Sequence, residues 1–515
     1  MEKFLYNRIV KKNPKINLWW CYGASESFAL STLGYLNIFK YFDVDPDICV
    51  ERIYSNSTSF EINPKNVDFV GFSISFELDI FNIISMLKKY NFPLNSSLRG
   101  EKDPIIFAGG FVISSNPFCF QDIFDFFVMS DMVSLDGVLK VIKNKNNKSR
   151  DEILKELSEL NGIYVPKFPK TNIKILRDDL SQNIFYTPIL SDKSYFQNTF
   201  IAELERGCPK MCNFCSASWL NLPFRMCSYE KIIQTLELGL KYTNKIALLG
   251  AYVAGHKDFS NIIDFLSKKD IELNISSLRA DLADEKLFKT LVKCGQKTAT
   301  VALEAGSFRL REFINKDLSD EEFTTTILTM AKAGLKGAKI YFMIGLPTET
   351  DEDILSLIGL MKNIKSKLKI QNTPGFNLTI SSSSFVPKLN TPFEEMERFD
   401  KKILQNRINI LNKELSKLGI SYKAPSLDWD IVQSILSRYT DSLFDFLVDV
   451  ELKGANLGAF KQVWRQYNKK GMLPDFDICA KSPLNNIKTL NFQWDIFNFH
   501  ASVLKNVKKN AILYR

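Results

Sequence analysis

The sequence predicts an α/β fold with two parallel β-sheets, the second of which is an incomplete barrel. Strand-like and helix-like segments alternate through roughly the first 150 residues, the pattern of a parallel sheet with helical crossovers. Six further strand candidates alternate with amphipathic stretches over residues 199–383. After residue 394 the chain is rich in Lys, Leu and Ile at helical spacing, which predicts a mainly helical end.

In the first series, apolar runs bounded by turn residues predict strands at residues 67–74, 103–110 and 124–129. Residues 78–90 have helical spacing. The second strand ends in a pair of glycines, Gly109 and Gly110. Glycines at this end of a parallel strand either let a ligand approach the backbone or simply form a tight turn, and both interpretations stay open.

The second series predicts the six strands of a partial barrel. The strand candidates are residues 199–204, 245–250, 271–278, 298–303, 337–345 and 376–383, with helices expected at 229–240, 259–268 and 321–333. In parallel barrels the chemistry takes place at the carboxyl ends of the strands. We therefore expect functional residues directly after these strands.

Composition shifts divide the chain into four parts. We expect a first domain at residues 1–150, a linker punctuated by prolines at 151–193, a barrel at 194–394 and a helical region at 395–515. At 515 residues, with 45% hydrophobic and 24% charged residues, the chain has the composition of a globular protein with ample core.

Charge and targeting features limit the partners and the compartment. The net charge of +9 permits an RNA or another anionic partner but does not argue for one. The start of the chain lacks the apolar segment of a signal peptide, and no run reaches the ~18 apolar residues of a membrane-spanning helix. Nine cysteines without a paired framework suit a reducing compartment. We expect a cytoplasmic protein without a membrane partner.

Three cysteines at spacing CxxxCxxC follow the first barrel strand, namely Cys208, Cys212 and Cys215. Three thiolates can hold three corners of a cubic iron–sulfur cluster and leave the fourth iron open for an outside ligand. The alternative is structural zinc, which needs four ligands. The only histidines, His256 and His500, lie far from the trio, and the other six cysteines are scattered singly.

Beyond the trio, the sequence resembles the radical S-adenosylmethionine superfamily, in the group whose core follows a cobalamin-binding-like domain. The runs that carry the resemblance in the core are residues 276–281, 295–298, 304–307, 314–316, 339–350, 385–388 and 391–393. A looser match in the first domain is found at residues 71–73, 103–104, 109–110 and 116–117. The resemblance implies a Rossmann-like, cobalamin-binding-like first domain and a partial (β/α)6 barrel.

The resemblance also implies a reaction. S-adenosylmethionine would bind the open iron of a [4Fe-4S] cluster, and one electron would cleave its C–S bond to give a 5′-deoxyadenosyl radical that abstracts hydrogen from a substrate. A reducing partner such as flavodoxin or ferredoxin would supply that electron. RNA, a protein or a small metabolite could be the substrate, and methyl transfer is one of several reactions that share this core.

By the same resemblance, the three cysteines are the cluster ligands and Phe214 shields the cluster. The run that begins at Gly345 would lie against the adenine. From the residues alone, that run could equally be a strand-to-helix turn.

Further positions of this sequence match residues that contact S-adenosylmethionine. The backbone of Gly250 and Ala251 would meet the amino group of the methionine moiety, and Glu304 would accept hydrogen bonds from the ribose. Lys316 would meet the methionine carboxylate, and Arg279 could serve the same purpose. A basic residue in a helical stretch, such as Lys316, is otherwise expected to be a solvated surface residue.

The sequence departs from the family pattern at two places. It has no histidine before His256, which excludes a histidine ligand to cobalamin in the first domain and leaves room only for cobalamin without one. The acidic Gly-Asp-x-Glu signature of related sequences is replaced by residues 130–133, which weakens the case for a ligand site there. His256 itself is expected at the surface or in a lid rather than as a base.

Two functions from other classes stay open. One is an electron-transfer or binding protein whose cluster cleaves nothing. Against it, a ferredoxin-like module needs four thiolates for each cluster, and only three are grouped here. The other is a degenerate scaffold, which the altered first domain suggests and the intact cysteine run disfavours.

Overall fold

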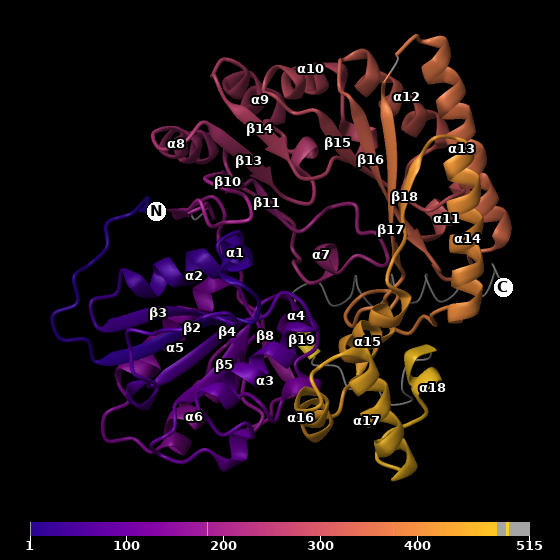
Figure 1. The fold of residues 1–515 in the computed structure, drawn as a ribbon. Helices are drawn as coiled ribbons and strands as arrows, with labels where there is room; N and C mark the ends of the chain where they lie inside the picture. The colour runs from indigo at the N-terminus through magenta and orange to yellow at the C-terminus, as the bar shows by residue number, and fades with distance from the viewer. Residues whose placement is uncertain (1, 183, 374, 482–490, 494–515) are drawn as a thin grey trace.

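The computed structural model describes residues 2–182, 184–373, 375–481 and 491–493. An amino-terminal α/β domain packs below a larger parallel barrel, and the last helices return to the first domain (Figure 1). Within the described ranges, no helix is both long enough and apolar enough to cross a membrane.

The first domain is built on a six-stranded sheet in the order β3-β2-β4-β5-β6-β7. Five strands are parallel, and β7 pairs antiparallel with β6. The strands are β2 (Ile16–Tyr22), β3 (Ile48–Tyr54), β4 (Phe69–Ser73), β5 (Ile105–Gly109), β6 (Phe126–Val128) and β7 (Ile163–Tyr164). The strand order reverses between β2 and β4, and ligands of open parallel sheets bind at the carboxyl edge beside such a point.

The three strands predicted in this domain are confirmed as β4, β5 and β6, and the predicted helix is α3 (Asp79–Lys89). Sequence reasoning missed β2 and β3. Helices α2 (Leu33–Asp43), α5 (Leu135–Lys143) and α6 (Arg150–Glu159) cover one face of the sheet, and α3 covers the other.

The predicted partial barrel is confirmed, with all six strands at the expected places. They are β10 (Phe200–Glu203), β13 (Lys245–Leu249), β14 (Glu272–Ile275), β15 (Thr298–Glu304), β16 (Gly337–Ile344) and β17 (Asn377–Ser384). The strands pair in parallel, and a bridge between Leu278 and Val301 joins the two halves. A seventh short strand, β18 (Ser421–Lys423), extends the sheet beyond β17.

Helices surround the outside of the barrel and bury alternate strand residues. These helices are α8 (Tyr229–Leu240), α9 (Phe259–Ser267), α10 (Glu285–Lys293), α12 (Asp320–Lys332), α13 (Asp351–Ile370) and α14 (Lys401–Lys417). On β16, Ile340 and Phe342 belong to this core. Because strand side chains alternate between faces, Lys339 and Tyr341 lie on the opposite, inner face, where Tyr341 is exposed.

The described part of the segment expected as a linker contains three strands, and the first of them, β7, belongs to the first sheet. Besides β7, it contains β8 (Asn172–Lys174) and β9 (Ile189–Leu190). Strand β9 pairs with β1 (Lys3–Phe4), and β8 pairs with β19 (Asn491–Gln493) from the other end of the chain.

The described part of the carboxyl-terminal region is mainly helical, as predicted, and it divides between the two domains. Helix α14 packs on the barrel. Helices α15 (Leu427–Arg438), α16 (Phe444–Leu452), α17 (Leu457–Lys469) and α18 (Phe476–Lys481) pack on the α3 face of the first sheet (Figure 1). Residues 482–490 and 494–515, for which the prediction was also made, lie outside the described residues.

Candidate functional site

The cysteine loop begins directly after β10, at the carboxyl edge of the barrel. It runs from β11 (Glu205–Arg206) to α7 (Ser216–Trp219). All three cysteines of the loop are free thiols; Cys208 and Cys212 are buried and Cys215 is half-buried. The loop therefore presents its sulfur atoms where a parallel barrel carries its chemistry.

Hydrogen bonds from neighbouring segments hold the loop in shape. The Asn213 backbone N–H donates to the Ile314 carbonyl at 3.0 Å, and the Asn315 side chain donates to the Met211 carbonyl at 2.9 Å. The Trp219 indole donates to the Cys212 carbonyl at 2.9 Å. Met211 has a φ of +49°, a conformation that such bonds help to maintain. The cysteine positions are thus fixed by the surrounding fold.

Two cations act on the thiols. Burial raises the pKa of Cys212 to about 12, while the charges of Lys316 and Arg279 act in the opposite direction. Burial also raises the pKa of Cys208, and Arg279 again opposes it. Since metals bind the thiolate form, a metal and these cations together would provide the stabilisation that deprotonation needs.

The donor set fits a [4Fe-4S] cluster. Within the described residues, no three His, Cys, Asp or Glu side chains converge on a point that could hold one metal ion. The thiolates of a cubane bind separate corners and therefore stand farther apart than the ligands of a single ion. Three free thiols in one braced loop beside two cations suit a cubane with one open iron.

The structure brings three of the other predicted residues to this site. Glu304 ends β15 with a φ of +70°, and the Lys316 ammonium lies 3.4 Å from its carboxylate. Lys316 is buried, so the expectation of a solvated surface lysine is wrong. Arg279 follows β14 and pairs with Asp281 at 2.9 Å. Carboxylate, ammonium and guanidinium groups thus surround the thiols at one edge.

The backbone after β13 meets a carboxyl group that the sequence analysis did not single out. A Cβ atom on Gly250 would lie 1.9 Å from a Glu205 carboxylate oxygen, so any larger residue there would force the Glu205 side chain to shift. The same oxygen accepts the Tyr252 N–H at 2.7 Å. The other oxygen is buried without a hydrogen-bond partner among the described residues, and burial raises the pKa of Glu205 to about 7. Ala251, beside it, is exposed.

Gly345 lies at the end of β16 with a φ of +81°. Its N–H donates to the Glu349 carboxylate at 2.8 Å, and Arg407 of α14 donates to the same oxygen at 2.8 Å. The turn is therefore held by the carboxyl-terminal region. Phe214 packs against a small apolar cluster at the ends of these strands, which includes Phe313.

His256 is not at the surface, which corrects the expectation for this residue. Its side chain is buried. One ring nitrogen lies 2.9 Å from the Cys227 carbonyl, and the other accepts the Asp258 N–H at 3.1 Å. This pattern assigns the ring proton to the nitrogen facing Cys227. The histidine therefore braces the loops behind the cysteine run.

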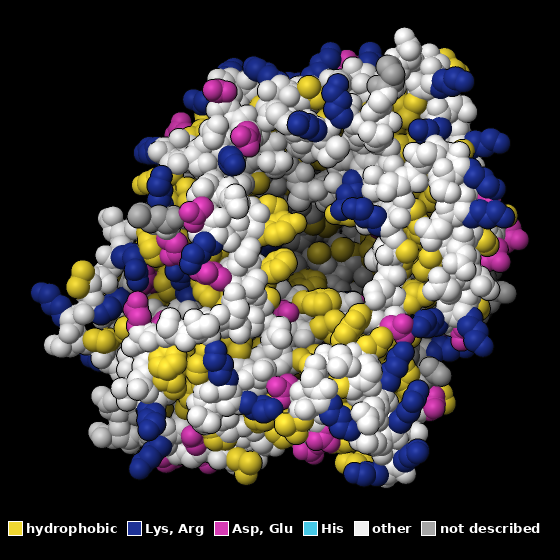
Figure 2. Space-filling model, in the orientation of Figure 1, with side chains coloured by type: hydrophobic (Ala, Val, Ile, Leu, Met, Phe, Trp, Pro, Cys, Tyr) yellow, Lys and Arg dark blue, Asp and Glu magenta, His cyan; other side chains and the backbone are white. Residues whose placement is uncertain are grey.

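A cavity of about 600 Å³ lies between the carboxyl edge of the first sheet and the barrel. Ser73, Gly109 and Asp131 line it from the first domain, and Leu249 lines it from β13. Figure 2 shows the molecule hollowed between the two domains, with hydrophobic side chains around the hollow. No histidine is among the lining residues, so a corrinoid would bind here without a histidine ligand.

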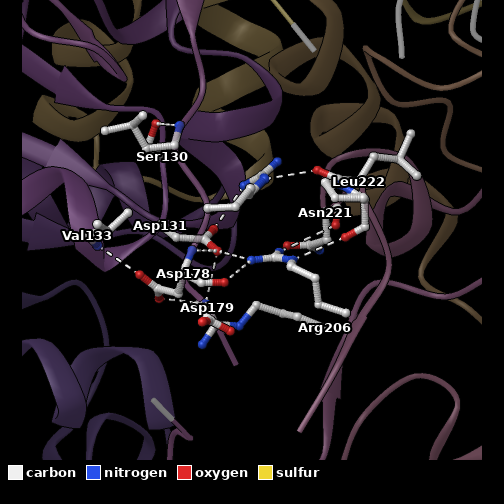
Figure 3. Close-up of polar contacts among 12 residues, drawn as sticks. Ser130, Asp131, Val133, Asp178, Asp179, Arg206, Asn221 and Leu222 are labelled. Carbon is white, nitrogen blue, oxygen red and sulfur yellow. Dashed lines mark hydrogen bonds and ion pairs between the residues drawn. The ribbon is translucent and has the colours of Figure 1, made fainter. Parts of the chain in front are cut away.

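The altered acidic signature of the first domain lies in the wall of this cavity. Asp131 forms ion pairs there with Arg177, Arg206 and Arg225 (Figure 3). Sequence reasoning missed this network because its members are far apart in the chain. The nearest signal was Arg206, two residues before Cys208.

Two protein families match successive parts of the chain. The family described as "Radical SAM proteins, N-terminal" matches residues 34–166, and the family described as "Radical SAM superfamily" matches residues 203–361.

Individual relatives extend these matches. An uncharacterised protein of Methanocaldococcus jannaschii is 31% identical over 74% of this chain and 80% of its own length. The threonylcarbamoyladenosine tRNA methylthiotransferase MtaB of Aquifex aeolicus is 23% identical over 53% of this chain and 64% of its own length. Among solved structures, the radical S-adenosylmethionine methyltransferase TsrM from Kitasatospora setae, with cobalamin and a [4Fe-4S] cluster bound, shares the fold. Its TM-score is 0.54 at 11% identity, over 89% of this chain and 100% of TsrM.

Proposed function

The chain belongs to the radical SAM superfamily, whose enzymes use a [4Fe-4S] cluster and S-adenosylmethionine, and on this premise we propose a specific reaction. Cys208, Cys212 and Cys215 hold the cluster. Bound there, the cluster supplies the electron that cleaves S-adenosylmethionine to methionine and a 5′-deoxyadenosyl radical, which abstracts hydrogen from the substrate.

One observation carries the proposal: the braced cysteine loop lies beside Arg279, Glu304 and Lys316 at a single edge of the barrel. In the proposed complex, Lys316 or Arg279 pairs with the methionine carboxylate. Glu304 accepts hydrogen bonds from the ribose hydroxyls. The backbone of Gly250 and Ala251 faces the amino group, and Gly345 lies along the adenine. These residues bind and orient the cofactor rather than react with it.

The remaining residues exclude water from a reactive species. Phe214 and the apolar cluster at the ends of β15 and β16 form an apolar surface beside the loop. A radical that can abstract hydrogen must be kept from solvent and from side reactions. Phe214 thus has the shielding role that its place beside the last cysteine suggests.

We further propose a division of the chain by task. Residues 1–150 form the domain that faces the substrate or a second cofactor, and residues 194–394 form the radical core, with 151–193 between them. The helices of residues 395–481 pack on both. The cavity at the first sheet supports a role in group transfer, such as methyl transfer assisted by a corrinoid without a histidine ligand.

MtaB, named for its action on a tRNA, supports a macromolecular substrate as one candidate class. The physiological electron donor is a flavodoxin- or ferredoxin-like protein.

The deciding experiment is anaerobic reconstitution of the cluster, followed by incubation with dithionite and S-adenosylmethionine. We expect 5′-deoxyadenosine to accumulate with the wild type and to be absent with Cys212→Ala. Cys294→Ala is the matched control, because Cys294 is another buried cysteine of the barrel domain that lies in the helical layer. A cluster that forms in the wild type without any cleavage product would instead support electron transfer. The absorption spectrum after supplementation with cobalamin tests the corrinoid separately.

A further inference from the structure

The carboxylate of Asp131 holds three guanidinium groups at the boundary between the two domains. Its oxygens lie 2.9 Å from Arg177, 3.1 Å from Arg206 and 2.6 Å from Arg225, and its side chain is 8% exposed (Figure 3). Asp131 follows β6 at the carboxyl edge of the first sheet. One carboxylate of the first domain thus contacts several segments of the chain at once.

The three arginines come from segments on both sides of the cysteine loop. Arg206 lies in β11, two residues before Cys208, and pairs in register with Arg225 of β12 (Arg225–Met226). Arg177 donates to the Leu220 carbonyl and, at 3.0 Å, to the Leu222 carbonyl, both after α7. Asp131 therefore connects to the chain that enters the loop and to the chain that leaves it.

The network is balanced in charge. Arg206 also pairs with Asp178 at 2.9 Å and with Glu203 at 2.8 Å, which gives three carboxylates for three guanidinium groups. Burial alone would raise the pKa of Asp131, but the charges of Arg206, Arg177 and Arg225 outweigh it and hold the pKa at about 2. Removal of this one charge would leave buried arginines without full compensation beside the loop.

The network also forms part of the cavity wall. Asp131, Arg177 and Arg206 line the cavity at the first sheet, and Arg206 leads into Gly207 and Cys208. The same side chains therefore separate the cavity from the segment that carries the cysteines. Because Arg206 is only two peptide bonds from Cys208, a change in the arrangement of these side chains would shift the first cluster ligand.

We propose that Asp131 is a positioning residue for the radical reaction: from the first domain it fixes, through Arg206, Arg225 and Arg177, the orientation of the cysteine loop. Asp131 stands at the place of the aspartate in the altered signature, and the inference gives this residue a role at the cysteine loop. This inference rests on the proposed function. It assigns to the first domain a part in the chemistry of the core that does not depend on any ligand in the cavity.

The first domain contains a matched ion cluster that serves as a control. Asp125 is buried and pairs with Arg99 at 2.9 Å and with Arg150 at 2.7 Å. Both partners lie in the first domain, far from the cysteine run in sequence and outside the cavity wall. Asp125→Asn therefore removes a buried carboxylate of the same kind, and it should destabilise the domain without contact with the loop.

The test compares Asp131→Asn with Asp125→Asn in the full-length, reconstituted protein. For each we would measure bound iron, the electron paramagnetic resonance spectrum of the reduced cluster with and without S-adenosylmethionine, and 5′-deoxyadenosine formed per cluster. We expect Asp131→Asn to bind iron, to show an altered spectrum and to lose cleavage by roughly 10- to 100-fold, the scale of a small misplacement. Asp125→Asn should lower the melting temperature but keep the wild-type spectrum and the yield per cluster.

A wild-type spectrum and yield in Asp131→Asn would overturn the inference, as would equal changes in both variants. If Asp131→Asn does not fold, Arg225→Lys keeps the charge and loses the guanidinium group that donates to both Asp131 and the Asp178 carbonyl, and it should show the same altered spectrum in milder form. An unaltered spectrum in a folded Arg225→Lys would also overturn the inference. If the wild type itself forms no 5′-deoxyadenosine, the proposed function fails, whereas the spectra still decide the role of Asp131.

Discussion

The molecule has two parallel sheets whose carboxyl edges face each other, and the two edges use their charged residues differently. At the barrel edge, Arg279 and Lys316 act on the cysteine thiols, and the Glu304 carboxylate accompanies them. At the first-sheet edge, Glu77 pairs with Lys388 and Asp131 pairs with three arginines, so both acids contact other parts of the chain.

This difference shows that a place at the carboxyl edge of a parallel sheet does not by itself determine what the charged residues there do. Parallel topology places loops at the carboxyl ends of strands in both domains. At the barrel edge these loops supply soft ligands and cations for a cofactor. At the first-sheet edge the charged groups join the domains, and small and apolar residues such as Ser73, Gly109 and Leu249 form the rest of the cavity wall. The following predictions test this contrast, from the largest effect to the smallest.

Removal of a thiol should lower the iron content of the protein only when the cysteine lies at the barrel edge. Cys212→Ala should abolish the stable cluster, because two thiolates do not hold a cubane. Cys21→Ala, in a buried first-domain strand, should keep full iron content. Iron and sulfide analysis after anaerobic reconstitution measures both. Equal loss of iron in the two variants would remove the contrast.

Carboxylates of the two edges should affect different properties. Glu304→Gln should weaken S-adenosylmethionine binding by roughly 10- to 100-fold, the worth of one hydrogen bond to a charged group. It should also lower the melting temperature, because the buried Lys316 loses the carboxylate that lies 3.4 Å away. Glu77→Gln should instead leave the half-buried Lys388 without its charge partner and cost about 3–5 kcal/mol of stability. Equilibrium binding and thermal unfolding of both variants would show whether the two effects separate.

The buried acids Glu205 and Asp131 should differ in their response to pH between pH 5 and pH 8. The pKa of Glu205 is raised from 4.5 to about 7 by burial, so its protonated form is favoured in the folded state. Its stabilising contribution is present below pH 4.5 and is lost as the pH rises through 7, a change of about 2–3 kcal/mol. The pKa of Asp131 lies at about 2, so Asp131 stays charged throughout this range.

Thermal unfolding of the cluster-free protein measures this difference. Glu205→Gln should melt roughly 3–6 °C above the wild type at pH 8 and close to it at pH 5. The gap between Asp131→Asn and the wild type should stay constant between pH 5 and pH 8. A pH-independent gap for Glu205→Gln would show that the Glu205 carboxyl has a partner or solvent in solution.

Local sequence patterns predicted the barrel and the cysteine loop because each rests on residues close together in the chain. The strands of the barrel bury one face under helices and alternate accordingly, as Ile340 and Phe342 do. Sequence reasoning missed β2 although β2, like the predicted β4, is buried on both faces, with Trp19 on one side and Trp20 on the other, and neither strand shows polar alternation.

Contacts between distant residues could not be predicted from the sequence. Asp131 and Arg206 are separated by 75 positions and meet only because β6 and β11 end at the same boundary. The same reason explains His256, whose partner Cys227 lies in a neighbouring loop. A lone polar residue in a sequence carries no sign of the partner that the fold will bring to it.

The packing of α16 and α17 on the first sheet has a consequence for the order in which the molecule is completed. Phe81 of α3 meets Phe460, and Trp464 fills the same core, so the first domain is completed by residues that follow the barrel in the chain. The barrel is synthesised before these helices, so the apolar α3 face of the first domain stays exposed until they have left the ribosome and packed on it.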